Sequence, residues 1–189
     1  MNEALKNIMS RRSVKAYKPE MPSQELIDQV VEAGTHAPTG MNRQSPIIIE
    51  VTDKAVRDKL SKMNADVMGA KIDPFYGAPV VLVVLADKSV GTYKYDGSLV
   101  MENLMLAANA VGLGSCWIHR AKEEFESEEG RELLRQLGIS GNISGGIAKN
   151  AVADADVLLG IKAPLGQQSL ALGRFKRLFC AVDPAGAQT

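Results

Sequence analysis

The sequence is poor in cysteine, in aromatic residues and in net charge. It contains two cysteines, Cys116 and Cys180, among 189 residues, too few for a disulfide framework or a cysteine-rich zinc site. Its 22 basic and 22 acidic residues cancel, which argues against nucleic acid or an anionic membrane as the main partner, because both favour a net basic field. The longest apolar run, 78–86, is far shorter than the roughly 20 residues that a membrane-spanning helix needs.

The motifs of several common enzyme classes are also missing. The sequence has no G-x-S-x-G nucleophile elbow, no G-x-G-x-x-G fingerprint and no Walker A motif. His36 and His119 are too few and too far apart in sequence to indicate a metal site. Residues 1–13 lack the apolar core of a signal peptide. We therefore expect a cytoplasmic protein without a resident metal and without a nucleophilic triad.

The remaining composition is that of an ordinary folded domain, with 46% hydrophobic and 23% charged residues, and the length predicts one domain over 1–189. Apolar residues recur at helical spacing in the segments 3–10, 24–34, 54–71 and 122–137. Short apolar runs, mostly rich in β-branched residues, predict strands at 46–52, 79–87 and 115–118, of which the first is too uniformly apolar to be half-exposed. This order of elements predicts an α+β sandwich.

One predicted helix, 96–111, is apolar nearly all round. A helix of that kind must be covered on most sides, and in so small a domain a second subunit is the simplest cover. We therefore expect this helix to form the core of a dimer.

The composition changes after residue 140, because 141–189 contain no Glu, Tyr or Trp. The segment 152–161 is a candidate strand and 170–178 a candidate basic helix. Two interpretations stay open for this atypical tail. It is either a diverged variable end or a segment out of register with the ancestral coding frame.

Three polar clusters are candidates for binding chemistry. The first holds Arg11, Arg12, Ser13 and Lys15, which suit a phosphate dianion, although cations also favour an ordinary helix C-terminus. The second is the loop 38–44, whose amides Asn42 and Gln44 suit a ring edge that alternates C=O and N–H, although it also suits a plain connector. The third is 112–119, where glycines allow close backbone approach or simply end a helix.

Together these motifs resemble the nitroreductase family of flavin mononucleotide (FMN) enzymes. The resemblance rests on RRSVKAY (11–17), EAGTHAPTGMNRQSP (32–46), APVVLVV (78–84) and DGSLVMENLMLAANAVGLGSCWIH (96–119), and covers roughly residues 3–140. It implies a three-layer α/β/α sandwich around a mixed, mainly antiparallel sheet. It also implies an intertwined homodimer with FMN at the subunit interface.

The resemblance further implies which residues bind FMN. They are Arg11, Arg12, Ser13 and Lys15 at the phosphate and the N1–C2=O side, Pro38, Thr39, Gly40, Met41, Asn42 and Gln44 in the loop that would come from the partner subunit, and Ile118 and His119 beside N5 and O4. The helix 96–111 would then be the dimer seam.

The implied activity is a ping-pong reaction in which NADH or NADPH reduces the flavin, leaves, and is replaced by a small-molecule acceptor such as a nitroaromatic or a quinone. Flavin N5 carries the chemistry, so no catalytic side chain is expected. Two alternatives remain, a non-catalytic protein that stores FMN and a dimeric protein without any cofactor.

Overall fold

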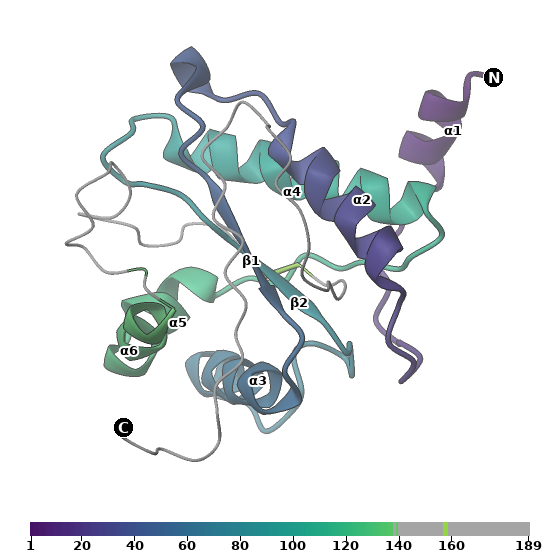
Figure 1. Cartoon of the computed structure of the whole chain (residues 1–189). Coiled ribbons are helices and arrows are strands. Elements are labelled where there is room, and N and C mark those ends of the chain that lie inside the picture. Colours follow the sequence, from purple (N-terminus) through teal and green to yellow (C-terminus); the bar gives the residue numbers. More distant parts are fainter. Residues whose placement is uncertain (138, 140–156, 159–189) are drawn as a thin grey trace, which may run out of the picture.

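The computed structural model describes residues 1–137, 139 and 157–158. In this part of the chain, helices surround a three-stranded antiparallel sheet of order β1-β2-β3 (Figure 1). The strands are β1 (Ile47–Val51), β2 (Val81–Leu85) and β3 (Val157–Leu158). The helical elements are α1 (Glu3–Ser10), α2 (Gln24–Thr35), η1 (Gly40–Asn42), α3 (Lys54–Met68), α4 (Tyr93–Ala110), α5 (Ala121–Glu126) and α6 (Glu128–Gln136). The predicted α+β class is confirmed.

Strands β1 and β2 are buried on both faces, as the apolar run of β1 predicted, and even Glu50 of β1 is only 9% exposed. Alternate residues point to opposite sides of the sheet, so Ile49 and Val83 pack in the cluster that includes α3, α5 and α6. Ile48 and Leu82 pack instead in the cluster with α2 and α4. Figure 1 shows these two groups of helices on opposite sides of the strands.

Helix α4 packs mainly against α2 of its own chain. Leu104 is fully buried, and a Cβ built on Gly34 would lie 2.6 Å from Leu104 Cδ2. The helix predicted over 24–34 ends at Thr35, one residue later, and Gly34 near its end also allows close contact with α4. The apolar character of α4 is explained in part within one chain, although Leu99 remains 43% exposed.

Two other boundaries differ from the predicted ones. The expected helix 122–137 is interrupted at Ser127, whose extended backbone separates α5 from α6 and whose hydroxyl caps α6 by accepting the Gly130 N–H at 3.0 Å. The expected strand 115–118 is reduced to isolated bridges at Ser115, which pairs in parallel with Ser13, and at Ile118.

Part of the predicted C-terminal structure lies within the described residues. Within the candidate strand 152–161, Val157–Leu158 pair with Leu82 and Val83 of β2. The candidate helix 170–178 lies outside the described residues. Among the described helices, none combines the length and apolarity of a membrane span.

Candidate functional site

The first and third polar clusters lie side by side. The backbone N–H of Val14 donates to the carbonyl of Ser115 at 3.0 Å, next to the bridge between Ser13 and Ser115. A Cβ built on Gly114 would lie 3.0 Å from the Val14 side chain, so glycine permits this close approach. Segments that are about 100 residues apart in sequence therefore form one surface.

The two neighbouring arginines have different environments. Arg12 Nη1 donates to the carbonyls of Met9 and Arg11 at 2.7 and 2.8 Å, and so caps the C-terminus of α1. Arg11 Nη1 is buried and has no hydrogen-bond partner among the described residues. The ordinary helix-end interpretation thus accounts for the Nη1 contacts of Arg12, whereas Arg11 Nη1 is left as a buried donor without a partner among the described residues.

Cys116 lies beneath this basic group. Burial raises the pKa of the Cys116 thiol. The charges of Lys15 and Arg11 and a hydrogen bond to Ser13 lower this pKa, but burial has the larger effect. The thiol is therefore kept neutral, unlike the thiolate of a catalytic cysteine. The arrangement supports an anion-binding role for the cations and no nucleophilic role for Cys116.

Lys15 also lies close to an aromatic residue that the motifs did not single out. Its Nζ is 5.9 Å from the centre of the Tyr76 ring. Tyr76 has a left-handed backbone with φ of 54°, uncommon for a residue other than glycine. Sequence reasoning missed Tyr76, although Asp73, Pro74 and Gly77 around it are typical turn residues.

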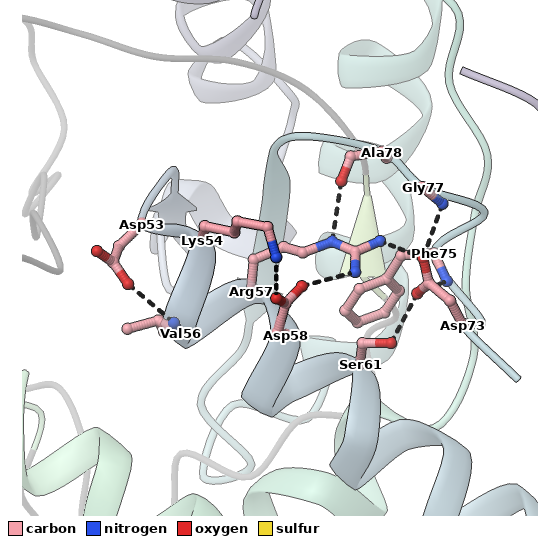
Figure 2. A network of polar contacts seen from close by, with 10 residues as sticks. All are labelled: Asp53, Lys54, Val56, Arg57, Asp58, Ser61, Asp73, Phe75, Gly77 and Ala78. Carbon is pink, nitrogen blue, oxygen red and sulfur yellow. Dashed lines mark hydrogen bonds and ion pairs between the residues drawn. The ribbon is translucent and has the colours of Figure 1, made fainter. Parts of the chain in front are cut away.

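A network around Asp73 holds the Tyr76 turn (Figure 2). The Asp73 carboxylate accepts the backbone N–H groups of Phe75 and Gly77 at 3.0 and 2.7 Å, together with bonds from Arg57 and Ser61 of α3. Burial opposes ionisation of Asp73, but these hydrogen bonds together lower its pKa. Helix α3 thereby fixes the turn that presents Tyr76 to Lys15.

The second polar cluster, 38–44, is fixed to the start of α4. The N–H of Gly40 donates to Asp96 Oδ1 at 2.9 Å, and Thr92 Oγ1 donates to Asp96 Oδ2 at 2.8 Å. A Cβ on Gly40 would lie 2.3 Å from Thr92 Oγ1, so glycine is required by space. Asp96 is only 2% exposed, and sequence reasoning did not identify it as a support of the loop.

The loop itself presents exposed polar and apolar side chains. Met41, Asn42 and Gln44 have φ angles of 53, 54 and 51°, and Met41 is 77% exposed. Gln44 Nε2 donates to Asn42 Oδ1 at 2.8 Å, so the two predicted ring-edge amides lie together. Pro38 is exposed, and Thr39 Oγ1 closes the loop by accepting the Gln44 N–H at 3.0 Å.

The cluster 38–44 and the segment 11–15 lie at opposite ends of α4 (Figure 1). The loop is bonded to Asp96 near the start of the helix, whereas α1 is bonded near its end, where Asn109 Nδ2 donates to the Asn7 carbonyl at 3.1 Å. Asp96 and Asn109 are 13 positions apart along α4, which corresponds to about 20 Å. The structure does not bring these two clusters together within one chain.

The remaining predicted residues, Ile118 and His119, occupy a turn before α5. Ile118 is buried, while the exposed His119 ring stacks on Trp117 with 6.0 Å between ring centres. The His119 carbonyl accepts a bond from Asn64 at 2.8 Å, and Arg120 has φ of 85°. No sequence signal pointed to Asn64 or to a left-handed Arg120.

Comparison with known proteins decides the family. The model of the Nitroreductase family matches residues 8–149. The chain belongs to the nitroreductase family. The resemblance predicted from the motifs is therefore confirmed, and its extent agrees with the roughly 3–140 expected.

Individual relatives of this nitroreductase-family chain carry names that agree with the family assignment. A protein of Archaeoglobus fulgidus, provisionally named an NADH dehydrogenase/NAD(P)H nitroreductase, is 35% identical over 148 residues, which are 76% of this chain and 80% of that one. The FMN reductase [NAD(P)H] of Bacillus subtilis is 30% identical over 132 residues, 61% of this chain and 53% of that one. The chain thus spans about half of the Bacillus enzyme's length.

Solved structures share the fold. A nitroreductase with bound FMN from Desulfitobacterium hafniense has a TM-score of 0.72 at 27% identity, over 90% of this chain and 95% of that one. A nitroreductase with bound FMN from Bacteroides fragilis has a TM-score of 0.73 at 24% identity, over 95% and 100% of the two chains.

Proposed function

We propose that this chain is an FMN-dependent oxidoreductase that uses NADH or NADPH to reduce nitroaromatic, quinone or similar small-molecule acceptors by ping-pong hydride transfer. Membership of the nitroreductase family, the FMN-bound relatives of the same fold and the NAD(P)H-dependent name of the Bacillus relative support this proposal. The bound flavin supplies the hydride acceptor, so the residues of this chain need only bind it, orient it and stabilise charge.

Arg11, Ser13 and Lys15 suit the phosphate and the ring of FMN. The buried Arg11 Nη1, without a partner among the described residues, is the kind of donor that a phosphate oxygen satisfies. Lys15 is exposed beside it, and its ammonium would favour negative charge on the N1–C2=O side of a reduced ring. Ser13 would hydrogen-bond nearby. Arg12 is a phosphate-binding candidate on resemblance alone, and we expect a much smaller contribution from it than from Arg11, because its Nη1 already donates to two carbonyls.

The separation of the two polar clusters along α4 is the observation that carries the proposed assembly. Residues that contact the same ring must lie within that ring's length, yet Lys15 and Asn42 belong to clusters held at opposite ends of an 18-residue helix. A second copy of the chain resolves this conflict, because its loop 38–44 can meet the first copy's Arg11–Lys15 segment. The proposed enzyme is therefore a homodimer with FMN at the interface.

Exposed apolar side chains agree with such a dimer. Helix α1 buries no residue in its own chain and exposes Leu5, Ile8 and Met9 by 54, 53 and 61%. Leu99 adds exposed apolar surface on α4. A partner subunit would cover surfaces of this kind. We propose that residues 1–189 form one domain with a three-layer fold. Two copies of it would intertwine as a dimer in the cytoplasm.

Absorption spectroscopy of the purified full-length protein tests the activity. We expect a flavin spectrum, its bleaching by NADH or NADPH without oxygen, and its return when a quinone or nitroaromatic is added. A flavin that binds but is never reduced would establish the storage alternative. A colourless protein that does not bind added FMN would overturn the proposal.

A further inference from the structure

We infer that Asn64 is a positioning residue of the FMN site. Asn64 holds the peptide between His119 and Arg120 so that Arg120 keeps a left-handed backbone, which a residue with a side chain disfavours. The inference rests on the proposed function, because it assigns Asn64 an effect on FMN binding. The argument starts from the backbone of Arg120, which has φ of 85° and ψ of 1°. In this region the Cβ of an L-residue crowds the backbone, so that glycine is the usual occupant.

Asn64 bonds to both residues of this peptide. Its Nδ2 donates to the His119 carbonyl at 2.8 Å, and its Oδ1 accepts from Arg120 Nε at 2.9 Å. Nδ2 also donates to Glu124 Oε2 at 3.0 Å, which fixes the orientation of the amide. Asn64 is completely buried, so its two donors and its acceptor are all used inside the protein.

This clamp sets the direction of a main-chain donor. A trans peptide is planar, and its C=O and N–H point in opposite directions. Since the His119 carbonyl points towards the buried Asn64, the N–H of Arg120 points to the other side of the turn. That N–H directly follows Ile118 and His119, the residues assigned to the N5 edge of the flavin. Loss of Asn64 would free the turn to relax out of the left-handed region.

Glycine and alanine at position 120 separate backbone strain from side-chain contact. Both Arg120→Gly and Arg120→Ala remove the Nε bond to Asn64, but only glycine adopts the left-handed conformation without strain. We expect Arg120→Ala to weaken FMN binding about tenfold, as for loss of one good hydrogen bond, and Arg120→Gly to weaken it less than about threefold. Fluorescence titration of the apoprotein with FMN measures both.

The second arm tests Asn64 itself. Asn64→Ala should weaken FMN binding about tenfold with Arg120 present and less than about threefold in the Arg120→Gly background. Met63→Ala, at the neighbouring buried position of α3, is the matched control, because it opens a cavity in the core while every hydrogen bond of Asn64 to the 119–120 peptide is kept. It should leave FMN affinity within about twofold of the wild type. The glycine and alanine comparison stands even where Asn64→Ala does not fold.

Equal losses for Arg120→Gly and Arg120→Ala, or an Asn64→Ala loss that is the same in both backgrounds, would overturn the inference. Failure of the proposed function can be distinguished from failure of this inference. Even if the wild-type protein binds no FMN, the thermal unfolding of the apoprotein can still be measured for each variant. In that measurement Arg120→Gly should have a higher Tm than Arg120→Ala. The reverse order would rule out the strained turn without reference to FMN.

Discussion

The carboxylate of Asp96 on α4 accepts the backbone N–H of Gly40 at 2.9 Å, and this bond ties the loop 38–44 to the start of the helix. Its second oxygen accepts the Thr92 hydroxyl, so both sides of the buried carboxylate are occupied. The exposed loop therefore owes its position to a residue that is itself hidden from solvent.

Asp96→Ala is expected to loosen this loop. Alanine removes both acceptor oxygens, so the bonds from Gly40 and Thr92 are lost, at a cost of about 1–3 kcal/mol in the free energy of unfolding. FMN affinity should fall several-fold as well. The control is Asp53→Ala, which removes the N-cap of α3 at Val56 and should lower stability by about 1 kcal/mol without affecting FMN. Urea unfolding and FMN titration distinguish the two, and equal FMN losses would contradict the loop's role.

Arg11 and Arg12 make a matched pair for locating the phosphate. Arg11→Ala should weaken FMN binding by about 1.5–3 kcal/mol, because its buried Nη1 is the donor left for an anion. Arg12→Ala removes a cap of α1 and should cost FMN binding less than about 0.5 kcal/mol, since its Nη1 already bonds two carbonyls. Equilibrium titration with FMN measures both. An unchanged affinity in Arg11→Ala would place the phosphate elsewhere.

Leu99 and Leu104 distinguish the dimer interface from the core of one chain. Leu104 is fully buried against α2, so Leu104→Asp should unfold the chain, at a cost of about 3 kcal/mol or more. Leu99 is 43% exposed, so Leu99→Asp should leave the chain folded but separate the copies. Light scattering and circular dichroism measure the two effects. A Leu99→Asp protein that is still dimeric would move the interface away from this part of α4.

Sequence patterns sufficed where a single periodicity governs burial. The short apolar runs located β1 and β2 and predicted that β1 is not half-exposed, and helical spacing located α1, α2 and α3. The break between α5 and α6 was missed because the alternation of charged and apolar residues continues across it. The signal for the break was Ser127 followed by Glu128 and Glu129, which is an N-cap pattern.

The supports of the site were beyond sequence reasoning for a different reason. Asn64 and the His119 carbonyl are 55 residues apart, and Gly40 and Asp96 are 56 apart. A polar residue on a helix does not reveal its partner through spacing, since the partner is selected by tertiary packing. The close contact of Gly34 with Leu104 was missed for the same reason, because a glycine near a helix end indicates only a terminator in the sequence.

Lys15 is expected to raise the reduction potential of bound FMN. Its ammonium favours the negative charge of the reduced ring, so Lys15→Met should lower the two-electron potential by about 20–45 mV, the equivalent of about 1–2 kcal/mol. Lys18→Met is the control, since Lys18 is also an exposed lysine in the same extended segment. Equilibration with reference dyes measures both potentials. Equal shifts for the two lysines would indicate a general charge effect without a specific place for Lys15.

Glu124 should make stability depend on pH. Burial raises its pKa from 4.5 to about 8, although the Asn64 hydrogen bond and Arg120 act against this and Glu123 adds to it. The folded protein therefore keeps a proton that the unfolded chain loses above pH 4.5. This contribution to stability is fully present below pH 4.5 and is lost progressively as the pH rises to about 8.

Glu124→Gln removes this titration while keeping an acceptor for Asn64. The free energy of unfolding of the variant relative to the wild type should therefore increase between pH 4.5 and 8, by on the order of 4 kcal/mol for the full shift. Glu123→Gln, an exposed neighbour on α5, should change this difference by less than about 0.5 kcal/mol. Urea unfolding across this pH range measures all three proteins. Parallel profiles for wild type and Glu124→Gln would mean that the buried carboxyl group ionises as it does in the unfolded chain, and that Asn64 and Arg120 stabilise its charged form.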